Sequence, residues 1–408
     1  MTTTGSQDVT PKAGHTDIAG RSWQARMRVA INLLTEDPEH PSGAHWFWTR
    51  VIPEMAKRLE SGEELYLLVS PKSRVYHQGY GPGVRYITFP WSNEHRNLRT
   101  LSEQLYSPVR LLLSRIDVFN TLMAPPVNLS WSLVLHFKTM HAYTAPGSLP
   151  ALSRVYRRMQ YPRSARVADA IIINSESLRS EVQRYLEVDS GKLKLVHEAV
   201  DHELFRPGDA AAARAHVARY GITKPFVLFV SSLWPYKNCE GLLRAWALAR
   251  GDFGDRQLAI VGAGRDEKYV ASLYSLAAEL GIAPDIKFVG AIPLEETVSF
   301  YRAADAFVYP SFNETFGPPH SRSHGMRLPG RDLGRQRHAG DRGRSCGLVR
   351  PAGSRIDGQG HHRGPGTGKG SHARPRIAAA RKVTWGATAA STLDVYREAV
   401  ERREHRRK

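Results

Sequence analysis

Short apolar runs alternate with stretches of helical spacing from Met27 to about Pro310, in two successive series. The first predicts strands and intervening helices between residues 27 and 186, and the second does so between 225 and 311. The expected strands of the two series are 27–34, 64–71, 84–90, 116–122, 133–141, 170–175, then 225–233, 257–264, 286–292 and 306–311. The expected helices are 45–61, 175–186, 238–250, 268–281 and 294–304.

Near-continuous apolar strands separated by helices are typical of parallel sheets covered on both faces. The pattern therefore predicts an α/β protein with two Rossmann-like lobes, residues 27–200 and 201–319. Ligands of such sheets bind beyond the carboxyl ends of the strands, so we expect a site in the cleft between the lobes.

The pattern stops near residue 320 and returns only close to the C-terminus. Residues 320–380 show neither helical nor alternating apolar spacing, and Gly, Pro, Arg and His dominate them. We therefore expect the second lobe to be disrupted after about residue 319 by a basic segment over 320–375. Residues 376–408 predict a closing helix, with apolar residues on one face and charges on the other. The apolar face holds Val395, Ala399 and Val400.

The positive charge of the chain is concentrated in the same region. Residues 320–382 hold 15 of the 57 Lys and Arg residues against three acidic residues, a local +12 within the total of +18. A basic nucleic-acid-binding protein is therefore one alternative interpretation. The region has no aromatic residue on which bases could stack, so we expect no specific nucleic-acid partner.

Composition favours a cytoplasmic protein. The two cysteines, Cys239 and Cys346, are too few for a disulfide framework, which indicates a reducing compartment. No run of 18 apolar residues predicts a transmembrane helix. Residues 1–26 are expected to form a polar, disordered tail without the apolar core of a signal peptide.

Lys237 follows the first strand of the second series and a Pro turn, and a helix is expected to begin near Asn238. An ammonium group beside free helix N–H groups would bind a diphosphate. A solvated lysine in a tight turn is the alternative interpretation.

The stretch around Glu314 is the stronger feature. The last strand ends at Tyr309, and a polar loop runs from there to Gly317. The Glu314 carboxylate could accept a hydrogen bond from a sugar hydroxyl, and the amides of Thr315, Phe316 and Gly317 could bind phosphate. An ordinary loop with an N-capping residue is the alternative.

Two residues of the first series also have a functional and a structural interpretation. Gly43 follows the first strand, where it either lets the backbone approach a ligand or serves as a plain turn residue. His141 closes the apolar run 133–141, which makes it either a cleft residue or a structural histidine.

Two further patterns carry weaker signals. Five arginines between Arg154 and Arg166 lie among tyrosines, which suits either anionic lipid head groups or a solvated basic face. The Gly-x-Gly of residues 262–264 is better explained by a tight strand-to-helix turn than by dinucleotide binding.

Three stretches together resemble the retaining GT-B glycosyltransferases of family 4. They are VHEAVDHELFRPGD (196–209), VSSLWPYKNCEGLLRA (230–245) and FVGAIPLEETVSFYRAADAFVYPSFNETFG (288–317). The resemblance covers about 27–319 and 376–408. It implies transfer of a sugar from a nucleotide-diphosphate sugar to a glycan or lipid-linked acceptor with retention of configuration. It also implies no required metal or other cofactor, and work at the inner membrane face.

The resemblance assigns donor-binding and catalytic roles. Lys237 matches the lysine that holds the donor diphosphate. Glu314 matches the first glutamate of the family's E-x7-E pattern, which contacts the donor sugar. Thr315, Phe316 and Gly317 match the turn whose amides receive phosphate.

His141 resembles the histidine of the first lobe that lies over the donor sugar, and Gly43 resembles the glycine of the first-lobe loop. The family arginine that precedes the lysine is absent, and Ser232 and Tyr236 stand at its expected places. We therefore expect Glu314 and His141 to be the catalytic residues. Lys237, Ser232, Gly43 and residues 315–317 are the expected donor-binding residues.

The family's second glutamate belongs at position 322, where this chain has Arg322. Permitted codons for residues 320–333, read one base later, yield ILEAMACGCPVVTS, which restores that glutamate. Met326 has a single codon, so the freedom to choose codons that give this shifted sequence is limited. We therefore expect a shifted reading frame over about 320–375, with a purposeful basic insert as the alternative. An inactive remnant of the same ancestry is a further functional alternative.

Overall fold

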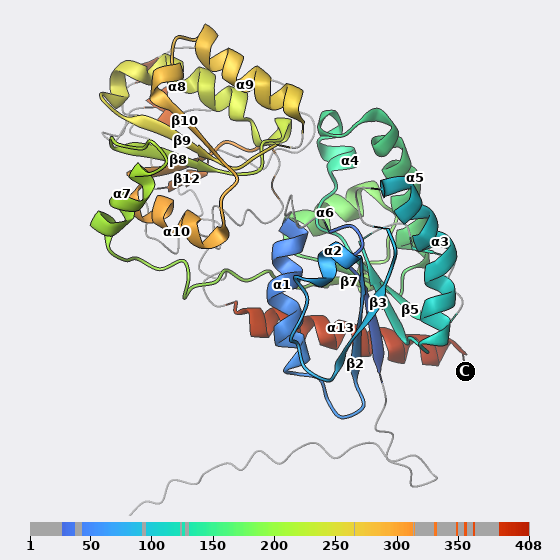
Figure 1. Cartoon of the computed structure of the whole chain (residues 1–408). Coiled ribbons are helices and arrows are strands. Elements are labelled where there is room, and N and C mark those ends of the chain that lie inside the picture. Colours follow the sequence, from blue (N-terminus) through green and yellow to red (C-terminus); the bar gives the residue numbers. More distant parts are fainter. Residues whose placement is uncertain are drawn as a thin grey trace, which may run out of the picture.

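The computed structural model describes residues 27–36, 43–91, 95–122, 125–126, 130–264, 266–312, 314, 330–332, 348–349, 355–356, 362–363 and 383–407. Two lobes are evident in Figure 1, each built around its own sheet with helices on both faces.

The first lobe has a seven-stranded parallel sheet in the order β3-β2-β1-β4-β5-β6-β7. Its strands are β1 (Arg28–Asn32), β2 (Glu64–Val69), β3 (Val84–Thr88), β4 (Val118–Thr121), β5 (Ser132–His136), β6 (Ala170–Ile173) and β7 (Leu193–Leu195). Every residue of β4, β5 and β6 is buried, and this explains why β6 is a continuous apolar run. The strand order reverses between β1 and β4, the position at which open α/β sheets bind ligands.

The second lobe has a five-stranded parallel sheet in the order β10-β9-β8-β11-β12. Its strands are β8 (Phe226–Val230), β9 (Gln257–Val261), β10 (Ile286–Gly290), β11 (Ala306–Tyr309) and β12 (Gly330–Asp332). The pattern did not predict β12, because its residues show no apolar alternation. Its backbone pairs with the edge of β11, whose N–H and C=O groups would otherwise lack partners.

A separate antiparallel ribbon consists of β13 (Leu348–Val349), β14 (Arg355–Ile356) and β15 (His362–Arg363). The remainder of the predicted basic segment over 320–375 lies outside the described residues, as does the proposed change of reading frame at Arg322.

The helices cover both sheets. Those of the first lobe are α1 (Gly43–Ala56), α2 (Pro71–Arg74), α3 (Arg96–Leu113), α4 (His141–Thr144), α5 (Ala151–Val167) and α6 (Glu176–Tyr185). Those of the second lobe are α7 (Ala210–Ala218), α8 (Cys239–Phe253), α9 (Glu267–Glu279) and α10 (Leu294–Ala303). Side chains of Ser175, Asp209 and Asp266 accept hydrogen bonds from first-turn amides of α6, α7 and α9, which fixes where these helices begin.

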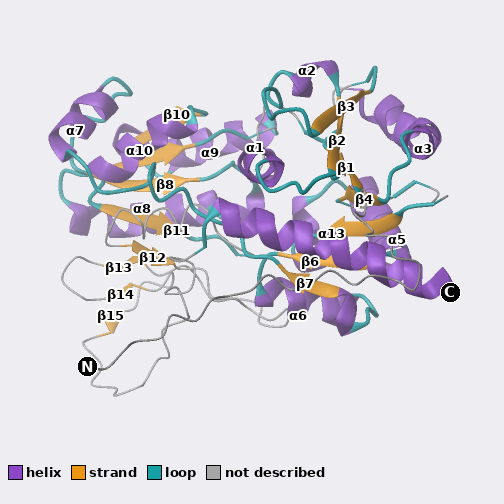
Figure 2. Cartoon of the chain, turned by 90° about the horizontal axis from the view of Figure 1, so that it is seen from below, coloured by secondary structure: helices purple, strands orange, loops and turns teal. Residues whose placement is uncertain are grey.

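The closing helix α13 (Trp385–Arg407) returns to the first lobe, where Figure 2 shows it running along the helices and strands of that lobe. Leu393, Tyr396 and Ala399 are buried in the first-lobe core, and the Ser132 hydroxyl donates to the Ala399 carbonyl over 3.0 Å. Arg397 pairs with Glu63 at 3.0 Å. The amphipathic pattern of this helix therefore reflects packing against the first lobe.

Helix α1 connects the two lobes. Trp46 packs against the core of the second lobe. The Arg50 guanidinium lies 3.7 Å from Glu295 at the start of α10 and 3.8 Å from Asp201 in the connector. These contacts place the N-terminus of α1 beside the second lobe.

Candidate active site

The loop after β8 presents Lys237 at the start of α8. Residues Pro235–Lys237 form a 3-10 turn, η4, and Asn238 then adopts a left-handed conformation with φ of 60°. The Asn238 side chain accepts a hydrogen bond from the Gly241 amide and donates another to the Pro310 carbonyl at 3.2 Å. This capping residue thus fixes the start of α8 and also ties it to the loop after β11.

Lys237 and Glu314 lie together, although 77 residues separate them in the chain. The Lys237 ammonium donates to the two Glu314 carboxylate oxygens over 2.7 and 3.1 Å, and to the Tyr309 hydroxyl over 2.8 Å. That hydroxyl donates in turn to Glu314 over 2.8 Å. Burial, then the neighbouring Glu314 carboxylate, raise the pKa of Tyr309, so the phenol stays protonated and acts as this donor.

Tyr309 is a site residue that the sequence reasoning missed. It is the last residue of β11 and is fully buried, so its apolar neighbours made it resemble an ordinary core tyrosine. Its position at the carboxyl end of a strand was the available signal.

The first lobe contributes His141, which meets Tyr236 of the second lobe with ring centroids 4.3 Å apart. Burial lowers the pKa of His141 to about 4, with smaller contributions from the Lys237 and Arg157 charges. The imidazole is therefore neutral near pH 7. A neutral ring next to a cation is suited to hydrogen bonding with a sugar hydroxyl and adds no further positive charge.

The expectation that His141 closes the fifth strand of the first lobe was wrong. That strand, β5, ends at His136, and His141 is instead the first residue of α4. Beyond the end of β5, the Lys138 ammonium donates to the buried Glu198 carboxylate over 2.8 Å. His141 nevertheless reaches the junction between the lobes.

The Gly-x-Gly of residues 262–264 is a tight turn, as predicted. Gly262 has φ of 135°, and a Cβ there would lie 1.9 Å from the Ser231 carbonyl oxygen. A Cβ on Gly264 would lie 2.8 Å from the Leu233 carbonyl oxygen. Both glycines allow the turn after β9 to pack against the loop that leads to Lys237.

The other predicted site residues are less closely engaged. Ser232 is exposed in the loop after β8. Gly43 begins α1, where a Cβ would meet no other atom within 4 Å, so its role as a glycine stays a prediction. Thr315, Phe316 and Gly317 lie outside the described residues.

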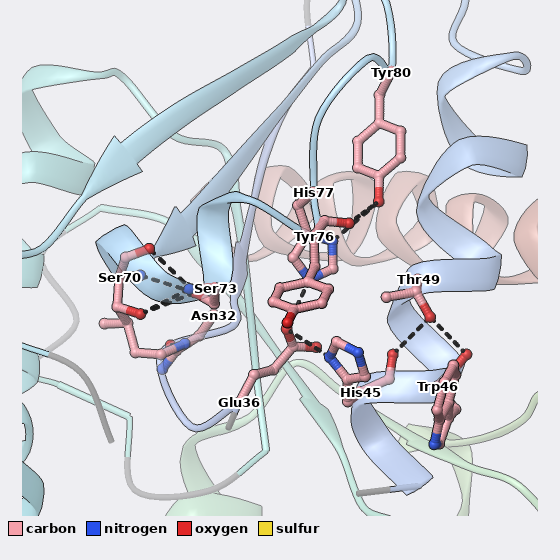
Figure 3. Close-up of polar contacts among 11 residues, drawn as sticks. Asn32, Glu36, His45, Trp46, Thr49, Ser70, Ser73, Tyr76, His77 and Tyr80 are labelled. Atoms are coloured by element: carbon pink, nitrogen blue, oxygen red, sulfur yellow. Dashed lines mark hydrogen bonds and ion pairs between the residues drawn. The ribbon is translucent and has the colours of Figure 1, made fainter. Parts of the chain in front are cut away.

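The structure also brings together three buried residues that the sequence reasoning did not connect: Glu36, His45 and His77 (Figure 3). They come from the loop after β1, from α1 and from the loop after α2, so no local spacing in the sequence signals the cluster. Among the described residues, this is the one group whose side chains could together hold a metal ion.

Two separate parallel sheets, each with a reversal of strand order, form a two-lobed architecture of the GT-B type, and a cation lies next to a carboxylate in the loops after the second-lobe strands. Residues 43–204 match the family model described as Glycosyltransferase Family 4, and residues 214–320 match that described as Glycosyl transferases group 1. The chain belongs to this glycosyltransferase family.

Curated relatives share part of the chain. A D-inositol 3-phosphate glycosyltransferase of Mycolicibacterium gilvum is 37% identical over 152 residues, which is 37% of this chain and 33% of that relative. A protein of the same name from Streptomyces avermitilis is 33% identical over 189 residues, or 44% of this chain and 40% of that relative. The chain thus spans between a third and two fifths of the length of these relatives.

Solved structures show the same fold at lower identity. Sucrose-phosphate synthase from Thermosynechococcus elongatus has a TM-score of 0.59 at 17% identity, covering 75% of this chain and 80% of that one. HepE of Anabaena, in complex with UDP-glucose, has a TM-score of 0.57 at 15% identity, covering 74% and 79%. These similarities establish the two-lobed architecture.

Proposed function

We propose that the chain transfers a sugar from a nucleotide-diphosphate sugar, with retention of anomeric configuration, to a glycan or lipid-linked acceptor. The observation that carries this proposal is the convergence of Lys237, Glu314 and His141 at the start of α8, from three different elements. Similarity to proteins named glycosyltransferases and to a structure in complex with UDP-glucose supports a nucleotide-sugar donor.

In this proposal, the two lobes have separate tasks. The Lys237 ammonium and the amides at the start of α8 receive the diphosphate, whose negative charge grows as the bond to the sugar breaks. Glu314 accepts hydrogen bonds from sugar hydroxyls, and the neutral His141 ring covers the sugar from the first lobe. The acceptor oxygen attacks from the face that the nucleotide leaves, and its proton passes to the departing phosphate oxygen.

A donor panel tests the proposal. The native chain and a version with the frame over 320–375 repaired are incubated with UDP-, GDP- and ADP-linked sugars, and D-inositol 3-phosphate serves as one acceptor. We expect Lys237→Met to lower kcat/KM by about 10²–10³-fold, as removal of a donor to a developing anion does. The control Lys268→Met, at an exposed position in α9, should leave kcat/KM unchanged. If neither chain binds any of these donors, the proposal is wrong.

The reading frame is a second part of this proposal. The match to the family model ends at residue 320, where the apolar pattern also ends. We propose that residues 320–375 are the product of a shifted frame, with the family's second glutamate encoded at the position of Arg322. Nucleotide sequencing around codons 317–320 and 370–380 tests this. An intact frame shared by close relatives would contradict it and favour a purposeful basic insert.

We also propose a peripheral contact with anionic lipid through α3 and α5. Leu105 and Leu113 of α3 are 66% and 74% exposed, and Leu152 and Met159 of α5 are 83% and 69% exposed. The two helices are neighbours in Figure 1. Arg163 and Arg166, at the end of α5, are exposed and would add positive charge beside the apolar side chains. Apolar side chains flanked by arginines suit the boundary between lipid head groups and acyl chains.

Vesicle sedimentation tests this contact. The native chain should bind vesicles containing phosphatidylglycerol and not vesicles of phosphatidylcholine alone. The double variant Leu105→Glu, Met159→Glu should lose binding, whereas Leu248→Glu, at an exposed position on α8 of the second lobe, should retain it. Equal binding by both variants would contradict the assignment. Among the described residues, no helix is long and apolar enough to cross a bilayer.

A further inference from the structure

The first lobe holds a cluster of one carboxylate and two imidazoles that the proposed sugar transfer does not use. Glu36, His45 and His77 are 5%, 4% and 0% exposed. Figure 3 shows the Glu36 carboxylate directed at both rings. Its Oε2 lies 2.7 Å from His77 Nε2 and 3.4 Å from His45 Nδ1, and the three donor atoms all lie within 4.8 Å of one another.

A chain of hydrogen bonds behind His77 favours one arrangement of protons. The Tyr80 hydroxyl donates to the Tyr76 carbonyl at 3.3 Å, so it can accept a hydrogen bond from His77 Nδ1, which lies 3.1 Å away. A neutral His77 that carries its proton on Nδ1 presents a bare Nε2 lone pair to the Glu36 carboxylate. Two electron-rich atoms 2.7 Å apart repel each other unless a cation lies between them.

Glu36 supplies a second, independent indication. Its other carboxylate oxygen, Oε1, is buried and has no hydrogen-bond partner among the described residues. A buried carboxylate oxygen without a partner is costly, and coordination to a cation is one way to compensate it.

We propose that Glu36, His45 and His77 bind a divalent transition-metal ion, with Zn²⁺ as the best-suited ion. Two imidazole nitrogens and one carboxylate oxygen form a donor set that Zn²⁺ accepts, at distances of about 2.0–2.2 Å. Tetrahedral donors at that distance lie about 3.3 Å apart, which falls between the shortest and the longest separations in the cluster. The bond from His77 to Tyr80 is the outer-shell hydrogen bond that orients a metal-bound histidine.

The position of the cluster suggests what the ion would do. It joins the loop after β1, the start of α1 and the loop after α2, three segments that show no strand pairing with one another among the described residues. Because α1 also carries the contacts of Trp46 and Arg50 to the second lobe, the ion would hold the helix that meets that lobe. The role is structural, and it does not depend on the proposed transferase activity.

Metal titration of the full chain tests this inference. Protein dialysed against a chelator is titrated with Co²⁺ alone, whose visible absorption reports coordination, and Zn²⁺ is then added as competitor. We expect one Co²⁺ per chain that Glu36→Gln and His77→Asn each abolish and that Zn²⁺ displaces. The control His216→Asn removes a histidine that pairs with Glu296 in the second lobe at 3.2 Å, and it should keep the signal. The histidines of residues 320–382 are present in the native chain and in every variant, so the test compares the Co²⁺ bound by the native chain with that bound by each variant.

Two results would overturn the proposal. The first is that the native chain and both variants, Glu36→Gln and His77→Asn, bind the same amount of Co²⁺. The second is a native chain that gives no Co²⁺ signal at all, a result that needs no variant to fold. The cluster would then be an imidazolium–carboxylate pair, with a proton in place of the metal ion. Circular dichroism of each variant confirms that loss of the signal is not loss of the fold.

Discussion

Replacement of Glu314 by glutamine should strengthen the binding of a nucleoside diphosphate while it weakens sugar transfer. In the structure without ligand, Glu314 accepts from the Lys237 ammonium at 2.7 Å, with side chains 27% and 8% exposed. An incoming diphosphate therefore competes with a carboxylate for the same ammonium group. The substitution removes the competitor and leaves the amide able to accept a weaker hydrogen bond.

The size of the effect follows from the geometry of the pair. Two unit charges 2.7 Å apart attract by about 6 kcal/mol at an effective dielectric constant of about 20. Desolvation and the partial exposure of the carboxylate offset most of this attraction, which leaves about 1–2 kcal/mol. UDP or GDP should therefore bind about 5–30-fold more tightly to Glu314→Gln than to the native chain.

Isothermal titration with UDP and GDP, which carry no sugar, measures this effect separately from sugar contacts. Glu279→Gln, at an exposed position on α9, is the control for a change of net charge. Turnover of the intact donor by Glu314→Gln should fall, because the carboxylate no longer contacts the sugar. Nucleoside diphosphate affinity that is unchanged or weaker in a folded Glu314→Gln variant would refute the idea that Lys237 receives the phosphates.

Four further substitutions test the structure. Burial lowers the pKa of His141 from 6.5 to about 4, so between these pH values the unfolded chain binds more protons than the folded chain. The free energy of unfolding should therefore fall by about 3 kcal/mol as the pH drops through this range. His141→Asn should flatten this part of the pH dependence, measured by urea denaturation at a series of pH values. Gly262→Ala places a Cβ 1.9 Å from the Ser231 carbonyl oxygen and should lower the free energy of unfolding by about 3 kcal/mol. Gly251→Ala, at an open position in α8, should raise it by about 0.5–1 kcal/mol. Equal unfolding midpoints for the two variants would contradict this expectation. Tyr396→Phe removes a buried hydroxyl that has no partner among the described residues and should raise the free energy of unfolding by about 1 kcal/mol, seen as a higher Tm.

The sheet strands could be predicted from the sequence because most of them are buried on both faces. Strands such as β6 and β8 contain only buried residues, so each is a continuous apolar run that turn residues delimit. Helix α5 was harder to recognise, because it contains Pro162 and its apolar side chains Leu152 and Met159 point into solvent. The spacing of apolar residues identifies a helix that packs one face against a core, and α5 contributes few side chains to the core.

The candidate site shows the same division. Lys237 and Glu314 each stand in the loop that follows a strand, β8 and β11 respectively, where the topology of a parallel sheet predicts that they meet. The bond to Tyr309 and the contact of His141 with Tyr236 depend on how loops and lobes pack, and no spacing along the chain encodes such contacts. The cluster of Glu36 with two histidines has the same origin, since its members meet only after β1 and β2 have paired.

The return of α13 to the first lobe has a consequence for the order in which the protein can fold during synthesis. Ser132 and Ala399, which share a hydrogen bond, are 267 residues apart. When a ribosome has made the first lobe up to β7, the core cluster that contains Val134 and Ile172 still lacks the side chains of Leu393 and Tyr396. Every described element of the second lobe emerges before those side chains do. The first lobe therefore begins to fold first and is completed last, and during translation the apolar side chains that α13 later covers would be a target for chaperones.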